Sequence, residues 1–260
     1  FFTNKGRVYR LKAYQIPESG RQAKGTAIVN LLELGHDEKV TAVIPVAEYK
    51  EGMYLFMATR NGTVKKTDLL EYDSIRKGGL AAVTLRENDE LIDVRLTDGT
   101  NDIILATRDG MAIRFNEEDV RPLGRVSQGV RGIRLEDDDY VVGMVASIED
   151  SSLLVVTENG FGKRTELDEY KVQTRGGKGI LTYRVTEKTG KIAGVKLVNE
   201  KDDIMLISSD GTIIRMKVEE ISILGRATQG VTLMRRSDDG SKVVSLARIV
   251  NEDEVVEEEE

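Results

Sequence analysis

The chain has 260 residues, no cysteine, one histidine (His36) and a formal net charge of −7 at pH 7. These features exclude a disulfide framework and a thiolate metal site, and the lone imidazole disfavours serine–histidine catalysis and a multi-histidine metal site. No apolar run approaches the roughly 20 residues of a membrane span, and no leader opens the sequence. We therefore expect a soluble cytoplasmic protein, and we read the first residues as the end of a strand whose natural chain extends upstream.

Five polar turns recur along the chain, and each follows an apolar run and ends in a glycine. Asn-Gly or Asp-Gly between such runs is a strong hairpin signal, because the tight turn requires positive φ. The spacings between the glycines are 56, 48, 50 and 51 residues, which indicates a repeat of about 50. The turn glycines are Gly6, Gly62, Gly110, Gly160 and Gly211.

Each repeat predicts four short strands. The strand before the turn is apolar on both faces, which indicates burial on both faces; these strands are 54–58, 103–106, 153–156 and 204–207. The strand after the turn ends in cations, at 8–10, 64–66, 113–114, 162–164 and 214–215. Third strands are predicted at 26–29, 80–83, 130–133, 180–183 and 231–234, and fourth strands at 40–44, 91–94, 141–145, 192–195 and 243–246. The fold class predicted is all-β, a propeller-like array of five four-stranded repeats.

A glycine-bearing loop separates the second and third strands of each repeat. Its last glycine lies 19, 17, 19, 19 and 19 residues after the turn glycine, and in four copies an arginine stands four residues before it. The loops are 21–25, 76–79, 124–129, 173–179 and 225–230. The fourth copy, Gln173-Thr174-Arg175-Gly176-Gly177-Lys178-Gly179, holds two cations and three glycines. Glycine lets backbone approach a ligand closely, and neighbouring Arg and Lys can bind phosphate.

The last ten residues carry seven of the 45 acidic side chains and no base. Residues 1–250 therefore hold 38 acidic residues (45 − 7) against 38 basic ones, a formal net charge of zero. A neutral body can still gather its bases on one surface, so a polyanionic partner is not excluded. We expect residues 1–250 to form one domain and 251–260 an acidic, disordered tail.

Catalytic signatures are missing from the sequence. There is no Gly-x-x-x-x-Gly-Lys-Ser/Thr loop, no obvious carboxylate pair and no nucleophile–base set. The acidic run 136–139 lacks the ligand spacing of an EF-hand and is better interpreted as a solvated turn. We expect no cofactor, no metal and no catalytic residue in this chain.

The recurring cations admit two interpretations. If each falls at a similar place on its repeat, the five copies form a basic stripe, and a phosphate backbone is the natural partner of a stripe. Alternatively, the cations pair with acidic side chains of the next repeat, as surface charges commonly do for little energy.

The heptapeptide resembles the "box" of the DNA gyrase A C-terminal domain, Gln-Arg/Lys-Arg-Gly-Gly-Arg/Lys-Gly, at six of seven positions; Thr174 replaces a base. The loops 21–25, 125–129 and 226–230 resemble degenerate boxes, and the Thr-x-Asn-Gly and Leu-Gly-Arg-x-x-x-Gly repeats are similar to those of that family. The resemblance covers residues 1–250.

The resemblance implies a β-pinwheel, a disc of four-stranded blades that share strands between neighbours. It also implies that duplex DNA wraps around a basic rim and is presented to the catalytic core of a type II topoisomerase for ATP-dependent negative supercoiling. The implied partners are double-stranded DNA, the ATPase subunit of the topoisomerase, and the N-terminal catalytic part of the polypeptide that carries this domain. The domain itself is expected to be non-catalytic.

Two departures from the family pattern bear on this interpretation. We count five repeats where the family usually has six, and the best box lies in the fourth repeat rather than the first, so a further upstream repeat is expected. The close alternative is the DNA-bending domain of topoisomerase IV, whose boxes are fewer and degenerate. A propeller-like protein-interaction scaffold and an enzyme with a central-channel site are the others.

The stripe hypothesis names sixteen residues that bind DNA without sequence preference: Arg21, Lys24, Lys65, Lys66, Arg76, Lys77, Arg125, Lys163, Arg164, Gln173, Arg175, Gly176, Gly177, Lys178, Gly179 and Arg226. About six phosphate contacts predict a salt slope near −5. Deleting 251–260 is expected to tighten DNA binding, because the tail competes for the bases. Replacing Arg175 and Lys178 together is expected to reduce DNA bending more than stability.

Overall fold

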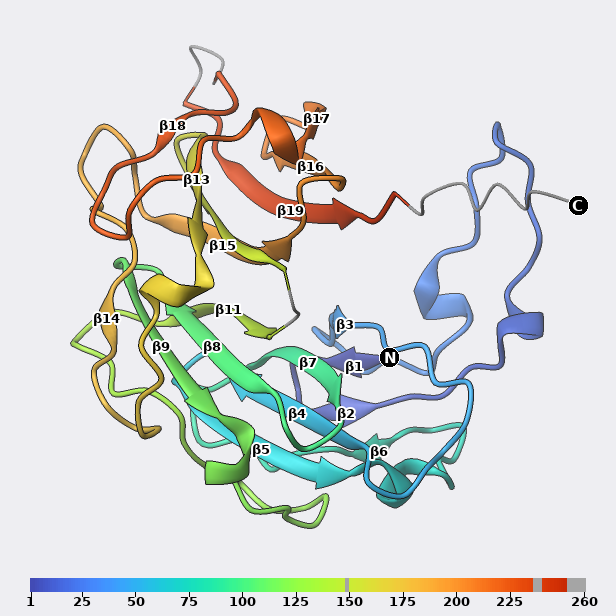
Figure 1. The fold of residues 1–260 in the computed structure, drawn as a ribbon. Helices are drawn as coiled ribbons and strands as arrows, with labels where there is room; N and C mark the ends of the chain where they lie inside the picture. The colour runs from blue at the N-terminus through green and yellow to red at the C-terminus, as the bar shows by residue number, and fades with distance from the viewer. Residues whose placement is uncertain (148–149, 236–239, 252–260) are drawn as a thin grey trace, which may run out of the picture. The chain divides into compact units, whose positions relative to one another are not determined.

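The structure is a computed structural model that describes residues 1–147, 150–235 and 240–251 (Figure 1). The expected acidic tail therefore lies, from residue 252 on, outside the described residues, and its role stays a prediction. Contacts divide the chain into two compact units. Unit 1 comprises Phe1–Leu105, Ile113–Ala146 and Val172–Gly179, and unit 2 comprises Ala106–Ala112, Ser147–Lys171 and the residues from Ile180 on.

Five antiparallel hairpins recur along the chain, each closed by one of the turn glycines. Their strands are β1 (Phe2–Thr3) with β2 (Arg7–Val8), β4 (Tyr54–Thr59) with β5 (Thr63–Asp68), β8 (Asp102–Thr107) with β9 (Met111–Asn116), β12 (Ser152–Thr157) with β13 (Phe161–Glu166), and β16 (Asp203–Ser208) with β17 (Ile213–Lys217). All five turn glycines have positive φ, between 72° and 100°, as the turn signal requires.

The fourth strand of each repeat pairs with the first strand of its own hairpin. These strands are β3 (Val40–Ala42), β7 (Leu91–Thr97), β11 (Val141–Ala146), β15 (Ile192–Val198) and β19 (Val243–Ile249). In β4, Met57 lies opposite Lys65 of β5 on one side and Val94 of β7 on the other. The first strand is therefore central in its sheet. Residues 55–59 of β4 are also buried on both faces, which explains why this strand is largely apolar throughout.

The third strand leaves its own repeat and pairs with the hairpin of the preceding one. It is short in every case: β6 (Leu80–Ala81), β10 (Val130–Arg131), β14 (Ile180–Leu181) and β18 (Val231–Thr232) pair with β2, β5, β9 and β13. Four sheets thereby have four strands, whereas the sheet β17-β16-β19 has three within the described residues. This exchange is the strand sharing that the β-pinwheel resemblance implied.

A glycine at the hairpin turn makes the exchange possible. At Gly110, φ is 100°, and its carbonyl oxygen accepts hydrogen bonds from the amides of Thr182 and Tyr183 at 2.8 and 3.2 Å. An added Cβ there would lie 2.4 Å from the Tyr183 carbonyl oxygen. Only glycine therefore permits both the turn and the close approach of the next repeat's third strand.

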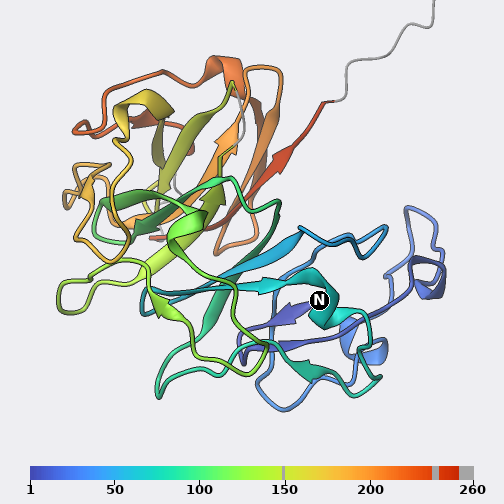
Figure 2. The same ribbon diagram turned by 60° about the horizontal axis from the view of Figure 1, so that its bottom comes forward.

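The predicted third strand at 26–29 is wrong. The segment instead contains a short 3₁₀ turn, η2 (Ile28–Asn30), and Val29 is 62% exposed. Third strands elsewhere are ordered by the hairpin of the repeat before them, and in the described part of the chain 26–29 has no such hairpin. Together with η1 (Ala13–Gln15), this segment belongs to a long excursion that leaves the β1–β2 sheet (Figures 1 and 2).

Each unit has its own apolar core. Two clusters in unit 1 form around Phe56 with Phe115 and around Leu55 with Tyr72, and one cluster in unit 2 forms around Leu154 with Ile204. Full burial of such a side chain stabilises the fold by about 1.5–3 kcal/mol. Short 3₁₀ turns follow the second strands: η3 (Leu69–Tyr72), η4 (Glu117–Asp119), η5 (Leu167–Glu169) and η6 (Val218–Glu220).

Candidate nucleic-acid interface

The cations in the middle of β5 and β13 are buried, contrary to the expectation of an exposed basic stripe at the strand ends. Lys65, Lys66, Lys163 and Arg164 are 1, 4, 0 and 4% exposed. Lys66 Nζ donates to the Glu117 carbonyl oxygen at 2.8 Å, and Arg164 Nε donates to that of Ile221 at 2.8 Å. These cations already have partners inside the fold and cannot reach a phosphate in this structure, so we do not include the four in the DNA-binding set proposed below.

Lys65 and Lys163 hold the glycine-bearing loop of the following repeat. Lys163 Nζ donates to the carbonyl oxygens of Gly225 and Arg226, both at 2.6 Å, and to Thr228 Oγ1 at 3.1 Å. Lys65 Nζ donates to the Ala82 carbonyl oxygen at 2.7 Å and to that of Arg125. Burial lowers the pKa of each ammonium to about 8.

The heptapeptide adopts a different backbone from these two loops. Gly176 has φ of 82°, and its amide donates to the Gly132 carbonyl oxygen at 2.6 Å. Gly177 has no lysine beneath it; its position faces Ile113, whose Cδ1 would lie 3.6 Å from an added Cβ. Val126 and Ala227 occupy the register of Gly176 and do not have positive φ, so the heptapeptide differs from the other two loops at this position. Gly177 does not have positive φ either.

Arg175 and Lys178 of the heptapeptide are held in different ways. The Arg175 guanidinium donates through Nε to the Asp119 carbonyl oxygen at 2.9 Å and through Nη1 to that of Arg131 at 3.0 Å. Lys178 is 60% exposed and pairs with Glu136 Oε1 at 2.6 Å. Arg175 is therefore a half-buried link to η4 and β10 with donors left over, whereas Lys178 is a solvent-facing charge.

The main chain of Gln173 is also fixed, because its amide donates to the Arg114 carbonyl oxygen at 2.8 Å. Its side-chain Nε2 is buried and has no hydrogen-bond partner among the described residues. Gly179 has φ of 75°, as its place at the end of the loop requires.

The loops 124–129 and 225–230 each present one half-buried arginine. Arg226 Nη1 donates to the Leu181 carbonyl oxygen at 2.8 Å, and its Nε lies 3.9 Å from Glu169 Oε2. Arg125 Nε lies 3.8 Å from Glu71 Oε2. The loop arginines thus lie near acidic side chains, as the alternative interpretation expected, but these belong to the preceding repeat and not to the next one.

The remaining predicted cations belong to unit 1 and are exposed. The side chains of Arg21, Lys24 and Arg76 have no hydrogen-bond or ion-pair partner within the described part of the chain. The Lys77 ammonium lies 3.5 Å from a Glu33 carboxylate oxygen. These four side chains remain available to an anion.

A second set of arginines escaped the sequence interpretation. Arg134, Arg184 and Arg235 each stand five residues after the last glycine of a loop, and all three are exposed. The amides of Arg134 and Arg184 donate to the Gly177 and Thr228 carbonyl oxygens of the following loop, at 2.8 and 3.1 Å. Each of these two therefore flanks a loop, and the constant register of the three arginines was the signal that could have found them.

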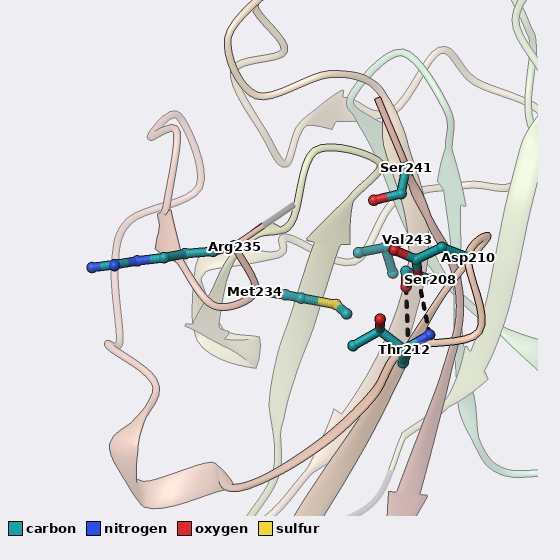
Figure 3. A pocket seen from close by; sticks show the side chains of 7 residues that line it. All are labelled: Ser208, Asp210, Thr212, Met234, Arg235, Ser241 and Val243. Atoms are coloured by element: carbon teal, nitrogen blue, oxygen red, sulfur yellow. Dashed lines mark hydrogen bonds between the residues drawn. The ribbon is translucent and has the colours of Figure 1, made fainter. Parts of the chain in front are cut away.

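Arg235 also borders a cavity of about 290 Å³ beside the last hairpin turn, lined by Ser208, Asp210, Thr212, Met234, Arg235, Ser241 and Val243. Its side chain points away from the other six (Figure 3). The turn is closed by hydrogen bonds from Ser208 Oγ to the Thr212 carbonyl oxygen and from the Thr212 amide to Asp210 Oδ1. The cavity lacks a convergent set of charged groups, so the interface is better sought at the loops.

Neither a metal-binding cluster nor a membrane-spanning helix occurs in the described residues. Among residues 1–147, 150–235 and 240–251, no group of three or more His, Cys, Asp or Glu side chains could hold a metal ion. In the same residues, no helix has the length and apolarity to cross a membrane.

Five sheets that exchange one strand between neighbours define the propeller-like class of repeat proteins called β-pinwheels. A family model described as "DNA gyrase C-terminal domain, beta-propeller" matches residues 1–47, 54–98, 101–147, 151–199 and 202–249, one stretch for each repeat. The chain belongs to this family, which confirms both the resemblance and the five-repeat, all-β fold.

Similar proteins fit the same family. The DNA gyrase A protein of Clostridium acetobutylicum is 55% identical over 97% of this chain, which spans only 30% of that relative's length. A solved structure titled as the C-terminal domain of DNA topoisomerase IV superposes with a TM-score of 0.87 at 30% identity, covering 95% of this chain and 77% of that one. A DNA gyrase A C-terminal domain superposes with a TM-score of 0.83 at 25% identity, covering 96% and 81%.

Proposed function

We propose that this chain is the DNA-wrapping domain of a type II topoisomerase. It binds duplex DNA without sequence preference, bends it and presents it to the catalytic core for ATP-dependent negative supercoiling. The domain does no chemistry itself, and its partners are DNA, the ATPase subunit, and the N-terminal catalytic part of its own polypeptide. A cytoplasmic location belongs to the same proposal.

The observation that carries the proposal is the heptapeptide in its local setting. Two glycines with positive φ shape the loop, the Arg175 guanidinium has N–H donors beyond its two hydrogen bonds, and Lys178 faces solvent. Arg134, in the segment after β10, donates its amide to the Gly177 carbonyl oxygen. Guanidinium and ammonium groups beside accessible backbone are suited to phosphate, and phosphate contacts carry no sequence information.

The DNA-facing set differs from the one expected from sequence. We retain the heptapeptide Gln173–Gly179 with Arg21, Lys24, Arg76, Lys77, Arg125 and Arg226, and we add Arg134, Arg184 and Arg235. If about six of these cations meet phosphates, log K falls with log[salt] at a slope near −5, at ~0.9 per contact.

Titration of fluorescent duplexes of two unrelated sequences between 50 and 300 mM salt tests the proposal. The expected result is equal affinity for both sequences and the steep slope, with energy transfer between duplex ends rising on binding. A flat salt dependence overturns the proposal and favours a protein-interaction scaffold.

The topoisomerase IV alternative has its own support, since a topoisomerase IV C-terminal domain superposes with the TM-score of 0.87. The assay that separates the two uses this chain fused to a gyrase catalytic core. Introduction of negative supercoils indicates the gyrase type, and relaxation alone indicates the topoisomerase IV type.

A further inference from the structure

We propose that Lys163, and Lys65 at the equivalent register, are positioning residues for DNA binding: each fixes, from inside the fold, the loop arginine that faces the phosphate. This inference rests on the proposed function. It concerns two residues that touch no DNA, because Lys163 and Lys65 are 0 and 1% exposed.

The geometry around Lys163 carries the inference. The Gly225 and Arg226 carbonyl groups belong to the two peptide units that flank the Arg226 Cα, and one ammonium binds both at 2.6 Å. Fixing both peptide units fixes φ and ψ of Arg226 and therefore the direction of its Cα–Cβ bond. Lys65 acts on Arg125 from one side, through the Arg125 carbonyl oxygen.

The donor count matches a charged lysine. An ammonium has three N–H donors, and Lys163 has three acceptors: the two carbonyl oxygens and Thr228 Oγ1. A neutral amine has two donors, so loss of the proton releases one acceptor and removes the charge that attracts the peptide dipoles. Loop order is thereby coupled to the protonation of a buried group.

Other charged and titratable groups face these ammonium ions. Glu169 of η5, Arg226 of the loop and the ring of Tyr183, 5.4 Å away, surround Lys163. Glu71, Arg125 and Tyr72 surround Lys65. Burial raises the pKa of both tyrosines above the usual value near 10. With both lysine pKa values at about 8, a change from pH 7 to 9.5 discharges these lysines and leaves most exposed lysines charged.

The chain contains its own control. At the same register beneath the heptapeptide stands Ile113, which carries no charge. The glycines of the heptapeptide and the two carbonyl bonds of Arg175 hold that loop instead. Arginine presentation there is therefore independent of pH.

The test is a double-mutant cycle on the whole chain with K163M, R226A and K163M/R226A. K163M and R226A are each expected to weaken binding about 3–10-fold, the value of one lost hydrogen-bonded contact, and each to reduce the salt slope by about 0.9. The double variant should bind no more weakly than R226A alone, because Lys163 acts through Arg226. Losses that multiply, or K163M equal to the parent, overturn the inference.

A second arm starts from the pH dependence of the parent chain. Parent affinity should fall between pH 7 and 9.5, and K65M/K163M should abolish that fall while R175A should not. If the parent binds DNA with the steep salt slope but shows no fall, the inference fails and the proposed function stands. If the parent shows no salt-dependent binding at all, the proposed function itself fails.

Discussion

The heptapeptide 173–179 and the loop 225–230 occupy the same register in successive repeats, yet the chain supports them by opposite means. The first has glycines at 176 and 177, an apolar Ile113 beneath it and two cations outside. The second has Ala227 and Thr228, the buried Lys163 beneath it and one half-buried arginine outside. Where Gly176 takes positive φ, no cation lies inside the loop. Where Ala227 occupies the same register without positive φ, a buried ammonium binds the loop carbonyl oxygens.

This difference shows that a basic residue in the sequence need not be an exposed charge in the folded protein. Each loop packs on the hairpin of the preceding repeat, whose second strand carries cations, but Lys163 is buried and Arg114 pairs with Asp102 at 2.8 Å. The cations of the loops themselves and the flanking arginines remain available to a partner. Charges inside the fold act on binding through geometry rather than through contact.

The largest expected effect comes from glycines that the two loops use differently. Gly230 has φ of 71°, and an added Cβ would lie 2.5 Å from the Gly162 carbonyl oxygen. Gly176 has φ of 82°, but its nearest atom would be 3.5 Å away. G230A should therefore lower the free energy of unfolding by about 3–5 kcal/mol and G176A by about 1–2 kcal/mol. Urea unfolding measures both, and equal losses would show that the two loops are held alike.

The next effect concerns the pH dependence of stability. The pKa of Lys163 is lowered to about 8 in the folded state, against an ordinary value of 10.5. Below pH 8 the folded and unfolded states both hold the proton, so this group adds no pH dependence to the free energy of unfolding. Between pH 8 and 10.5 the unfolded state binds the proton and the folded state does not, so stability rises with pH. K163M should remove roughly 1–3 kcal/mol of that rise.

At pH 7 the same variant should change stability by less than about 1 kcal/mol, since relief of the buried charge offsets the lost hydrogen bonds. Denaturant unfolding at pH 7, 8, 9 and 10 provides the profile, and I113V serves as the control without charge. Parallel profiles for the parent and K163M would exclude a lysine that loses its proton inside the fold.

The heptapeptide cations are expected to separate stability from bending. R175A removes hydrogen bonds to the Asp119 and Arg131 carbonyl oxygens and should cost about 1–2 kcal/mol. K178A should leave stability unchanged, because Lys178 is exposed. Each variant loses a phosphate interaction whose energy is comparable to the cost of bending the duplex, on the order of 1–6 kcal/mol. Both variants should therefore bend the bound duplex less and reduce energy transfer between its ends.

This expectation revises the one from sequence, in which loss of both cations hardly affects the fold. Melting curves for the two single variants decide between them. If R175A melts with the parent, its carbonyl bonds contribute nothing and the expectation from sequence stands.

Local chemistry explains what the sequence could predict. Asn-Gly and Asp-Gly turns, buried first strands and the 19-residue register all depend on residues close in sequence, and the hairpin glycines have the positive φ expected of them. The heptapeptide could be found because its glycines and cations are contiguous. The register of Arg134, Arg184 and Arg235 was equally regular but lay outside the glycine motif.

Long-range packing explains what it could not. Lys65 and Lys163 lie in strands that look polar in the sequence, and the next repeat's loop, 60 and 63 residues away, packs over them. The third strands form because a preceding hairpin orders them, so the segment 26–29 has the composition of a strand but not its structure. Sequence pattern reports which residues can be buried, and tertiary contact decides which are.

The smallest expected effect concerns the acidic neighbour of the heptapeptide. Glu136 accepts a 2.6 Å hydrogen bond from Lys178, and that bond holds the pKa of the Glu136 carboxyl below its usual range. DNA must displace this carboxylate to reach the ammonium. E136Q should therefore tighten DNA binding about twofold at 20 mM salt, an effect typical of an exposed pair, and the gain should vanish by 300 mM as salt screens the charge. D137N removes the same charge from the same turn without touching Lys178. The loop 225–230 has Gln229 where the heptapeptide has Lys178, so this position cannot form the equivalent ion pair. A gain in affinity for E136Q that D137N does not share assigns the effect to the Glu136–Lys178 pair, whereas equal gains would assign it to the net charge of the turn.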